Sequence, residues 1–521
     1  MQTNVLDYLT EAVARAPEKT AYSDGRNSEG AASGEIGSNE TNSVGAEQLS
    51  FKEVYDQSRS VAAFLHGNGV YREPVVIFME KRPKTIAAFF GVIAAGDYYI
   101  PIDVEMPENR IRLILENVKS EVMICTEDTI EQARGFGFAG QIVDYDEICH
   151  TDVDERALRK IYESAIDTDP IYIVFTSGST GVPKGVTACH RSVIDYVEHL
   201  SEALGFDENT VFGSQAPLYV DACLKEIYPT LKFCGTTYLI PKELFMFPVK
   251  LVEFLNEHKI NTICWVVSAL TMISAFGTFK SVTPKYLRLV AFVSEVFPIR
   301  EFNRWREAAP GATFVNLYGP TEGTGVCCYY IVDREFKPGD VIPAGRPFKN
   351  TDILLLNDKN EPAKPGEGGE ICIRGTSLSL GYYNAPEKTK EVFVQNPLNP
   401  FYPELIYRTG DMGKWNERGE LEFISRRDYQ IKHMGHRIEL GEIETNVNLL
   451  DEIKMTGCIY DKVKNKIVLY YVGEIDEKNL AAALKEKLPR YMFPNRIIRL
   501  ERMPLTLNGK IDRVALKEMY E

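Results

Sequence analysis

The stretch IYIVFTSGSTGVPKG (residues 171–185) decides the fold, because it joins a short apolar run to a loop of glycines, hydroxyl residues and a lysine. The apolar run predicts a buried strand. A glycine-rich loop after a strand exposes backbone N–H groups to an anion, and hydroxyl and ammonium groups add donors. The loop is not a Walker A loop, since Gly-Lys-Ser/Thr is absent and Pro183 precedes the lysine. The expected phosphate-binding residues are Thr176, Ser177, Gly178, Ser179, Thr180, Gly181 and Lys184.

Strand-like and helix-like segments alternate on both sides of this loop. PVVIF (74–78) predicts a buried strand and PKTIAAFFGVIAAG (83–96) a buried helix, while TTYLI (236–240) and VKLVEFLNEH (249–258) repeat the pair downstream. This alternation favours layered α/β architecture with largely parallel sheets. From about Thr351 the pattern becomes strand-rich with glycine turns, which indicates a β-rich subdomain.

The last ninety or so residues predict a small α+β unit. KIVLYYVGE (466–474) is strand-like and EKNLAAALKEKL (477–488) is helical. We therefore predict a large N-terminal domain over residues 1–427 and a small C-terminal domain over residues 428–521. The segment 25–47, rich in Gly, Ser, Asn and Glu, is expected to be a mobile surface loop without an assigned role.

Composition narrows the classes of function. The chain has 521 residues, 44% hydrophobic and 26% charged, with a net charge of −15 that argues against nucleic acid as the main partner. The longest apolar run, residues 86–96, is shorter than the roughly 18 residues of a membrane span. The N-terminus predicts an amphipathic helix rather than a signal peptide. Ten cysteines without a repeating framework suit a reducing compartment, so we expect a cytoplasmic protein without a nucleic-acid or membrane partner.

The segment FTSGSTGVPKG (175–185) resembles the phosphate-loop signature of the adenylate-forming enzymes, which include acyl-CoA synthetases, luciferase and the adenylation domains of nonribosomal peptide synthetases. Further segments between residues 49 and 513 resemble successive motifs of those adenylation domains: LSFKEVYDQSRSVAAFL, IAAGDYYIPID, NLYGPTEGT, GEICIRGTSLSLGYY, YRTGD, RRDYQIKHMGHRIELGEIE, LPRYMFP and NGKIDR. The resemblance implies ATP and Mg²⁺ as cofactors. It also implies adenylation of an amino acid, followed by thioester transfer to the phosphopantetheine arm of a carrier protein.

The resemblance assigns a role to each nucleotide-site residue. Lys510 in NGKIDR resembles the catalytic lysine that bridges carboxylate and phosphate. Asp411 in YRTGD resembles the carboxylate that accepts both ribose hydroxyls, with Arg426 assisting. Tyr318 resembles the residue that stacks on adenine, with Asn316 near the base. The same motif supplies Gly319, Thr321 toward the phosphate and Glu322 as the Mg²⁺ carboxylate.

The C-terminal domain of the family is thought to rotate between an adenylating and a thioester-forming arrangement, which implies that it is mobile here. Asp428 matches the hinge, and His433 and Gly435 lie in the segment that lines the pantetheine tunnel. Two positions depart from the family pattern: Ser425 replaces a glycine, and His433–Met434 replaces Ile-Arg. The second departure leaves the thiol partner open.

Asp221 in YVDACLKEIY resembles the aspartate that pairs with the α-ammonium of amino-acid substrates, which fatty and aryl acids lack. Lys225 favours an acidic substrate if it points inward, and a small or medium apolar amino acid if it extends outward. The side-chain pocket is expected to consist of Ala222, Lys225, Cys264, Ala291, Val293, Leu317, Gly325 and Val326.

Two other ligases remain as alternatives. One is an acyl- or aryl-CoA synthetase, against which Asp221 argues. The other is D-alanine–carrier-protein ligase, whose cysteine beside the substrate is replaced by Val293. The chain ends eight residues after Arg513 without a carrier module. We therefore expect either a free-standing enzyme that acts on a carrier in trans or a domain excised from a larger synthetase, and the start and the polar end of the sequence favour the former.

Overall fold

The computed structural model describes residues 2–26, 47–177, 183–337, 339–364, 366–427, 430–450, 452–505 and 511–520. Several predicted site residues lie outside these ranges: Gly178, Ser179, Thr180, Gly181, Asp428 and Lys510. Most of the predicted loop at 25–47 is outside them as well.

A six-stranded sheet carries the phosphate-loop strand near one edge. Its order is β6-β5-β3-β4-β7-β8, and only β8 runs antiparallel to its neighbour. The strands are β3 (Pro74–Phe78), β4 (Tyr98–Pro101), β5 (Val122–Cys125), β6 (Gln141–Asp144), β7 (Pro170–Thr176) and β8 (Lys184–Cys189). Side chains alternate along β3: Val75 and Ile77 enter one core and Val76 and Phe78 another, so both faces are covered.

A nine-stranded sheet lies beside it, in the order β15-β14-β13-β12-β11-β9-β10-β1-β2. Its middle strands, from β1 to β13, are parallel. The strands are β1 (Thr20–Ser23), β2 (Gln48–Ser50), β9 (Val211–Ser214), β10 (Thr236–Leu239), β11 (Thr262–Val266), β12 (Leu289–Val293), β13 (Thr313–Tyr318), β14 (Cys328–Ile331) and β15 (Arg346–Pro347).

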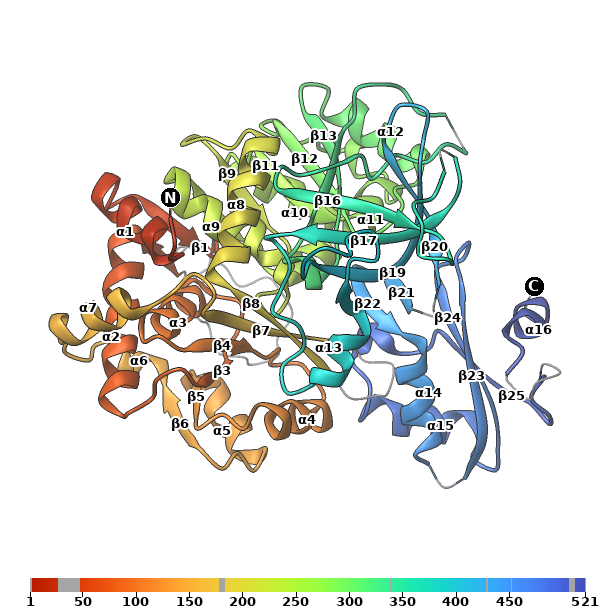
Figure 1. The fold of residues 1–521 in the computed structure, drawn as a ribbon, viewed down its shortest axis with the longest axis horizontal. Helices are drawn as coiled ribbons and strands as arrows, with labels where there is room; N and C mark the ends of the chain where they lie inside the picture. Colours follow the sequence, from red (N-terminus) through yellow and green to blue (C-terminus); the bar gives the residue numbers. More distant parts are fainter. Residues whose placement is uncertain are drawn as a thin grey trace.

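Helices form the layer between these two sheets (Figure 1). Their apolar faces share one core with both sheets: α1 (Leu6–Arg15), α2 (Phe51–Gly67), α3 (Pro83–Ala94), α8 (His190–Leu204) and α9 (Leu224–Phe233). The outer face of the six-stranded sheet is covered by α4 (Glu108–Val118) and α5 (Glu127–Gly135). The outer face of the nine-stranded sheet is covered by α10 (Pro248–Glu257), α11 (Val267–Ala275) and α12 (Ile299–Ala308). Short helices α6 (Tyr145–Ile148) and α7 (Glu155–Ser164) complete this part.

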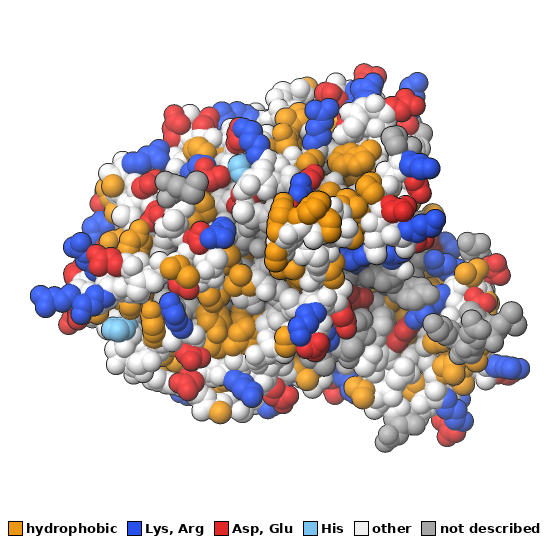
Figure 2. Space-filling model, in the orientation of Figure 1, with side chains coloured by type: hydrophobic (Ala, Val, Ile, Leu, Met, Phe, Trp, Pro, Cys, Tyr) orange, Lys and Arg blue, Asp and Glu red, His pale blue; other side chains and the backbone are white. Residues whose placement is uncertain are grey.

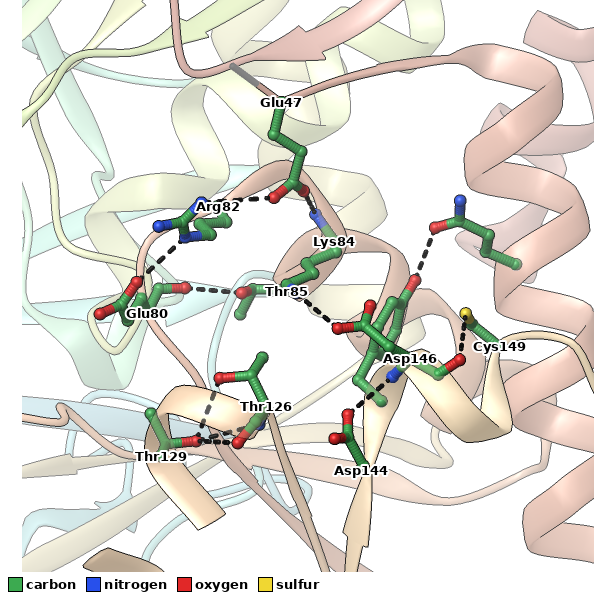
Figure 3. Close-up of polar contacts among 12 residues, drawn as sticks. Glu47, Glu80, Arg82, Lys84, Thr85, Thr126, Thr129, Asp144, Asp146 and Cys149 are labelled. Atoms are coloured by element: carbon green, nitrogen blue, oxygen red, sulfur yellow. Dashed lines mark hydrogen bonds and ion pairs between the residues drawn. The ribbon is translucent and has the colours of Figure 1, made fainter. Parts of the chain in front are cut away.

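A polar network attaches the chain after the 27–46 segment to this helical layer (Figure 3). The Glu47 carboxylate accepts a hydrogen bond of 2.7 Å from the backbone N–H of Lys84, in the first turn of α3. A carboxylate at a helix N-terminus satisfies an otherwise unpaired N–H group. Lys84 in turn pairs with Asp146 of α6 at 2.9 Å.

The predicted β-rich subdomain is an antiparallel five-stranded sheet. It contains β16 (Thr351–Leu356), β17 (Gly369–Gly375), β18 (Phe393–Gln395), β19 (Leu405–Trp415) and β20 (Leu421–Arg426), with α13 (Pro386–Val392) beside them. In Figure 2 apolar side chains gather over β16 and β17, whereas basic and acidic side chains are interspersed over most of this face.

The C-terminal unit, residues 430–520, begins with a hairpin of β21 (Gln430–His433) and β22 (His436–Glu439). A three-stranded sheet follows, built from β23 (Ile453–Asp461), β24 (Lys466–Gly473) and β25 (Arg496–Arg499). Its helices are α14 (Leu440–Asn448), α15 (Glu477–Lys485) and α16 (Arg513–Glu518).

The predicted fold class is confirmed, since layered α/β sheets, a β-rich subdomain and a small α+β unit follow one another along the chain (Figure 1). The domain boundary at 427/428 stays a prediction; β20 ends at Arg426 and β21 begins at Gln430. Within the described ranges, every helix is too short or too polar to cross a bilayer.

Candidate active site

The predicted site residues come together where the three large sheets and the C-terminal hairpin meet. Thr176 ends β7, Tyr318 ends β13, Asp411 lies in β19 and Arg426 ends β20. The carboxyl ends of parallel strands share one edge of a sheet, which is where ligands bind in open α/β folds.

The nucleoside end of the site consists of three residues that are far apart in the sequence. The Tyr318 hydroxyl donates to Asp411 Oδ2 at 2.5 Å, and Arg426 Nη1 donates to Asp411 Oδ1 at 2.7 Å. Asp411 and Arg426 are direct partners in the β19–β20 register, so sheet pairing itself brings the charges together. Burial and the neighbouring Asp411 raise the pKa of Tyr318 well above its usual value. The carboxylate predicted to bind ribose is therefore fixed in position by protein donors.

The turn after Tyr318 is tightly packed. Asn316 donates through Nδ2 to the carbonyl oxygens of Ile342 and Pro343 at 3.2 and 2.8 Å. A Cβ on Gly319 would lie 2.4 Å from the Cα of Val326, so only glycine fits there. These contacts fix the backbone of the residues predicted to surround the base.

Glu322 forms the centre of the phosphate end and is fully buried, with 0% exposure. The Tyr382 hydroxyl donates to its Oε1 at 2.7 Å, and Arg437 Nη1 donates to its Oε2 at 2.7 Å. Burial alone would raise the pKa of Glu322, but Arg437 and Tyr382 outweigh it and lower the pKa to about 2. Arg437 belongs to β22, so the C-terminal hairpin reaches into the site.

Two phosphate-loop residues also contact this hairpin. Ser177 donates through Oγ to the carbonyl oxygen of Arg437 at 2.8 Å. Lys184 Nζ lies 4.0 Å from Glu439 Oε1 and 5.5 Å from the centre of the Tyr382 ring. Burial, followed by Arg437, lowers the pKa of Lys184. In this arrangement the groups expected to bind phosphate bind the hairpin.

The donor set at Glu322 does not fit Mg²⁺ in this arrangement. Both carboxylate oxygens already accept hydrogen bonds, and the guanidinium of Arg437 occupies the cation's side of the carboxylate. Among the described residues no group of three or more His, Cys, Asp and Glu side chains could hold a metal ion elsewhere.

The hairpin turn is held against the large domain. Gly435 has a φ of +80°, and its backbone N–H donates to Glu295 Oε1 at 3.0 Å. A Cβ on Gly435 would lie 2.7 Å from Val266. His433 points the other way, with Nδ1 3.4 Å from the Tyr460 hydroxyl of β23. Of the two residues predicted for the pantetheine tunnel, only Gly435 contacts the large domain in the described contacts.

A second contact holds the C-terminal unit. Arg110 of α4 forms an ion pair with Glu442 of α14, and both side chains are buried. Arg110 also lies 4.0 Å from the sulfur of Met492. A buried ion pair that loses one partner leaves an uncompensated charge, so this pair is energetically sensitive.

The residues predicted to form the side-chain pocket for the acid are mainly apolar and are buried or partly buried. Cys264, Ala291, Val293, Leu317 and Val326 belong to one buried cluster, and Ala222 packs against it. Gly325 has a φ of +93°, and a Cβ there would meet the ring of Tyr196 at 2.9 Å. The parallel register of β11, β12 and β13 aligns these side chains, so the predicted pocket residues are brought together.

Three charged residues lie next to these apolar side chains: Asp221, Lys225 and Glu226. Burial raises the pKa of Asp221, while Lys225 and the Thr321 hydroxyl oppose that shift. Lys225 is 2% exposed, and its Nζ donates to the Ala222 carbonyl at 2.7 Å, so its head does not extend outward. Glu226 is fully buried, and neither of its oxygens has a hydrogen-bond partner among the described residues. Burial raises its pKa to about 7, against the attraction of Lys225 and Lys81.

Sequence reasoning missed four residues of this site. Arg437 and Tyr382 bind Glu322. The Nζ atom of Lys432 lies 5.7 Å from the centre of the Tyr318 ring. Glu226 lies beside Lys225. Burial, opposed by Asp411, lowers the pKa of Lys432. All four side chains lie in segments already singled out by motif, and for Arg437 and Lys432 the signal was a charge inside an otherwise strand-like run.

Comparison with known proteins agrees with this geometry. The AMP-binding enzyme family matches residues 9–383. Tyrocidine synthase 1 of Brevibacillus parabrevis is 31% identical over 478 residues, which are 90% of this chain and 43% of that protein. The chain thus spans less than half the length of this curated relative.

Two solved structures share the fold at low identity. One is the Vibrio cholerae adenylation domain AlmE in complex with glycyl-adenosine-5'-phosphate, with a TM-score of 0.82, 19% identity, and 100% of this chain and 98% of that chain covered. The other is o-succinylbenzoate CoA synthetase (MenE) of Bacillus subtilis. That match has a TM-score of 0.81 and 20% identity, and it covers 99% of this chain and 98% of that chain. Since the family match covers residues 9–383 of the 521 residues of this chain, the chain belongs to the AMP-binding enzyme family.

Proposed function

We propose that this enzyme activates an amino acid with ATP as its aminoacyl-adenylate and transfers the acyl group to the phosphopantetheine thiol of a carrier protein in trans. The observation that carries the proposal is Asp221, a carboxylate beside an apolar pocket whose charge calls for a cationic partner. The α-ammonium of an amino acid supplies that partner. An acyl- or aryl-CoA synthetase would have no use for it.

In the first half-reaction, Asp411 and Arg426 hold the ribose, while the end of β7 at Thr176 faces the α-phosphate. An oxygen of the substrate carboxylate forms a bond to the α-phosphorus, and the bond to pyrophosphate breaks. Lys510 is proposed to bridge the carboxylate and the phosphate during this step. In the second half-reaction the thiol loses its proton to solvent, its sulfur bonds to the acyl carbon, and AMP leaves with the electrons of the acyl–oxygen bond.

The arrangement with β21–β22 in the site is proposed to serve the second half-reaction. The residues that flank 506–510, Leu505 and Ile511, pair with each other, and Ile511 packs near Gly457 of β23. That sheet lies well away from β7 and β8 in Figure 1. Rotation about Asp428, between β20 and β21, would exchange the hairpin for the segment that carries Lys510.

The buried head of Lys225 supports an acidic substrate, such as glutamate or aspartate, because a cation in an apolar pocket attracts a carboxylate. A small or medium apolar amino acid remains the second candidate. It is favoured by the lining of Cys264, Ala291 and Val293 and by the bond from Lys225 to Ala222.

A pyrophosphate-exchange screen tests this proposal. L- and D-amino acids, including D-alanine, are compared with fatty and aryl acids. Exchange with fatty or aryl acids alone would contradict the amino-acid assignment, and a preference for D-alanine would favour the D-alanine ligase alternative. Lys510→Ala should abolish exchange without loss of folding, and an unchanged rate would refute the role of that lysine. A preference for acidic side chains that disappears in Lys225→Met would identify Lys225 as its cause.

A further inference from the structure

Tyr196 of α8 lies beside the residues predicted to form the side-chain pocket for the acid. It belongs to the buried face of the helix, with Val193, Val197 and Leu200 at spacings of three and four residues. The tip of its ring takes the space that a side chain at Gly325 would fill. A Cβ on Gly325 would lie 2.9 Å from Cζ and 3.2 Å from the hydroxyl oxygen of Tyr196. The hydroxyl therefore lies against one of the predicted pocket residues.

The Tyr196 hydroxyl is shielded from solvent and has no hydrogen-bond partner among the described residues. A buried tyrosine usually has such a partner, because an unpaired polar group costs free energy that a Phe ring would not. The hydroxyl of Thr324, next to Gly325, and both carboxylate oxygens of Glu226 are unpaired in the same way within the described part of the chain. Several unpaired polar groups near one predicted pocket indicate a ligand that pairs with them.

The surroundings of Tyr196 make its hydroxyl a donor. Burial, followed by the nearby Asp221 and Glu226, raises the pKa of Tyr196 well above its usual value, so the hydroxyl keeps its proton. Lys225 supplies a second donor, because its bond to the Ala222 carbonyl uses only one of the three protons of its ammonium. Two donors thus lie among the residues predicted to surround the substrate side chain, and a donor requires an acceptor.

We propose that Tyr196 is a specificity-determining residue whose hydroxyl donates a hydrogen bond to a terminal oxygen of the substrate side chain, so that the enzyme selects an amino acid that ends in a carboxylate or a carboxamide. This inference rests on the function proposed above and names the substrate class of the same site. An apolar side chain would leave the hydroxyl unpaired, which disfavours the small or medium apolar candidate.

The two polar side chains would use different partners. A carboxamide accepts from Tyr196 and donates through its NH₂ group to the unpaired oxygens of Glu226. A carboxylate accepts from Tyr196 and from Lys225 but offers Glu226 no donor. Comparison of Asn with Asp and of Gln with Glu as substrates therefore distinguishes the two.

Pairs of amino acids matched in shape test the proposal in pyrophosphate exchange. Asn and Asp resemble Leu in shape, and Gln and Glu resemble Met, but only the polar members carry terminal oxygens. We expect kcat/KM of the wild type for its preferred polar acid to exceed that for the apolar counterpart at least about 100-fold. The ratio of these two values is the measure of selectivity.

Tyr196→Phe removes the hydroxyl and keeps the ring. We expect kcat/KM for the preferred acid to fall about tenfold or more, while the value for its apolar counterpart stays or rises, so that selectivity falls by the same factor. The urea midpoint should not fall, because the lost hydroxyl has no partner among the described residues. Tyr22→Phe is the matched control, since the equally buried Tyr22 donates to the Ile227 carbonyl at 2.8 Å. That variant should unfold at lower urea and keep its selectivity.

Unchanged selectivity in folded Tyr196→Phe would overturn the role of Tyr196, whatever its urea midpoint. A wild-type preference for Leu, Met or a cationic side chain would overturn it as well. Either result would leave amino-acid activation intact and would refute only this inference. Absence of exchange with every amino acid would refute the proposed function instead.

Discussion

The two ends of the nucleotide site are assembled differently. At the nucleoside end, Tyr318, Asp411 and Arg426 all come from strands β13, β19 and β20 of the large domain. At the phosphate end, Ser177 and Glu322 complete their hydrogen bonds with the C-terminal hairpin. If the C-terminal unit rotates as proposed, the first end keeps its geometry and the second changes partners. For the two half-reactions proposed above, this arrangement would give the nucleotide site one fixed end and one exchangeable end.

The largest effect should come from breaking the fixed end. Asp411→Ala removes the acceptor shared by Tyr318, which is buried, and Arg426, whose side chain is 13% exposed, at a cost of about 3 kcal/mol. We expect ATP affinity to fall about 100-fold or more by calorimetry, with a matching loss of stability in urea. Asp152→Ala, at an exposed loop position, is the control. ATP affinity within twofold of the wild type would show that the nucleoside end is not where we place it.

Gly435→Ala should disable only the exchangeable end. The added Cβ must adopt a φ of +80° and approach Val266 to 2.7 Å. Strain of this kind costs about 1–3 kcal/mol, so thioester formation should slow about tenfold or more while pyrophosphate exchange persists. Gly419→Ala provides a matched control, because Gly419 has a φ of +68° but no atom within 4 Å of the added Cβ. Equal loss in both half-reactions would contradict the separation of the two ends.

A double-mutant cycle on Arg110 and Glu442 should give a smaller effect on the same arrangement. Arg110→Met and Glu442→Gln each remove one member of the buried pair between α4 and α14. We expect a coupling energy of about 1–3 kcal/mol, read from the free energies of unfolding in urea of the wild type, the two single variants and the double variant. ATP affinity should not change, since neither residue contacts the nucleoside end. A coupling energy near zero would mean that the pair does not hold the docked unit.

Tyr382→Phe should have the smallest effect. It removes one hydrogen bond of 2.7 Å to Glu322 from within the large domain, worth about 1 kcal/mol. The loss applies with or without the hairpin, so pyrophosphate exchange and thioester formation should each slow about fivefold. A loss confined to thioester formation would show instead that this hydrogen bond matters only when the hairpin is docked.

The fold was predictable from the sequence because its signals are local. Fully apolar runs such as PVVIF and the helical spacing of residues 51–67 each identify one element, and the order of the elements implies parallel layers. The two residues predicted to hold the ribose, Asp411 and Arg426, were identified from motifs alone. The structural cause of their pairing, the β19–β20 register that sets Asp411 opposite Arg426, depends on strand pairing.

The phosphate end could not be predicted in the same way. Nothing near Arg437 in the sequence indicates that its side chain reaches Glu322, because that contact depends on how the C-terminal unit docks. The direction of Lys225 was equally undetermined, since a long aliphatic stem can bury its head or extend it to water. The structure buries it, with its ammonium on the Ala222 carbonyl.

The Arg110–Glu442 pair has a thermal consequence. In the rotation proposed above, undocking of the C-terminal unit would hydrate two charges that docking strips of water again. Hydration of ions carries a strongly negative entropy, so dehydrating this pair becomes less costly as the protein warms. If the chain catalyses the two half-reactions proposed above, warming should therefore favour the docked arrangement and lengthen the time that the acyl group is presented to its thiol acceptor.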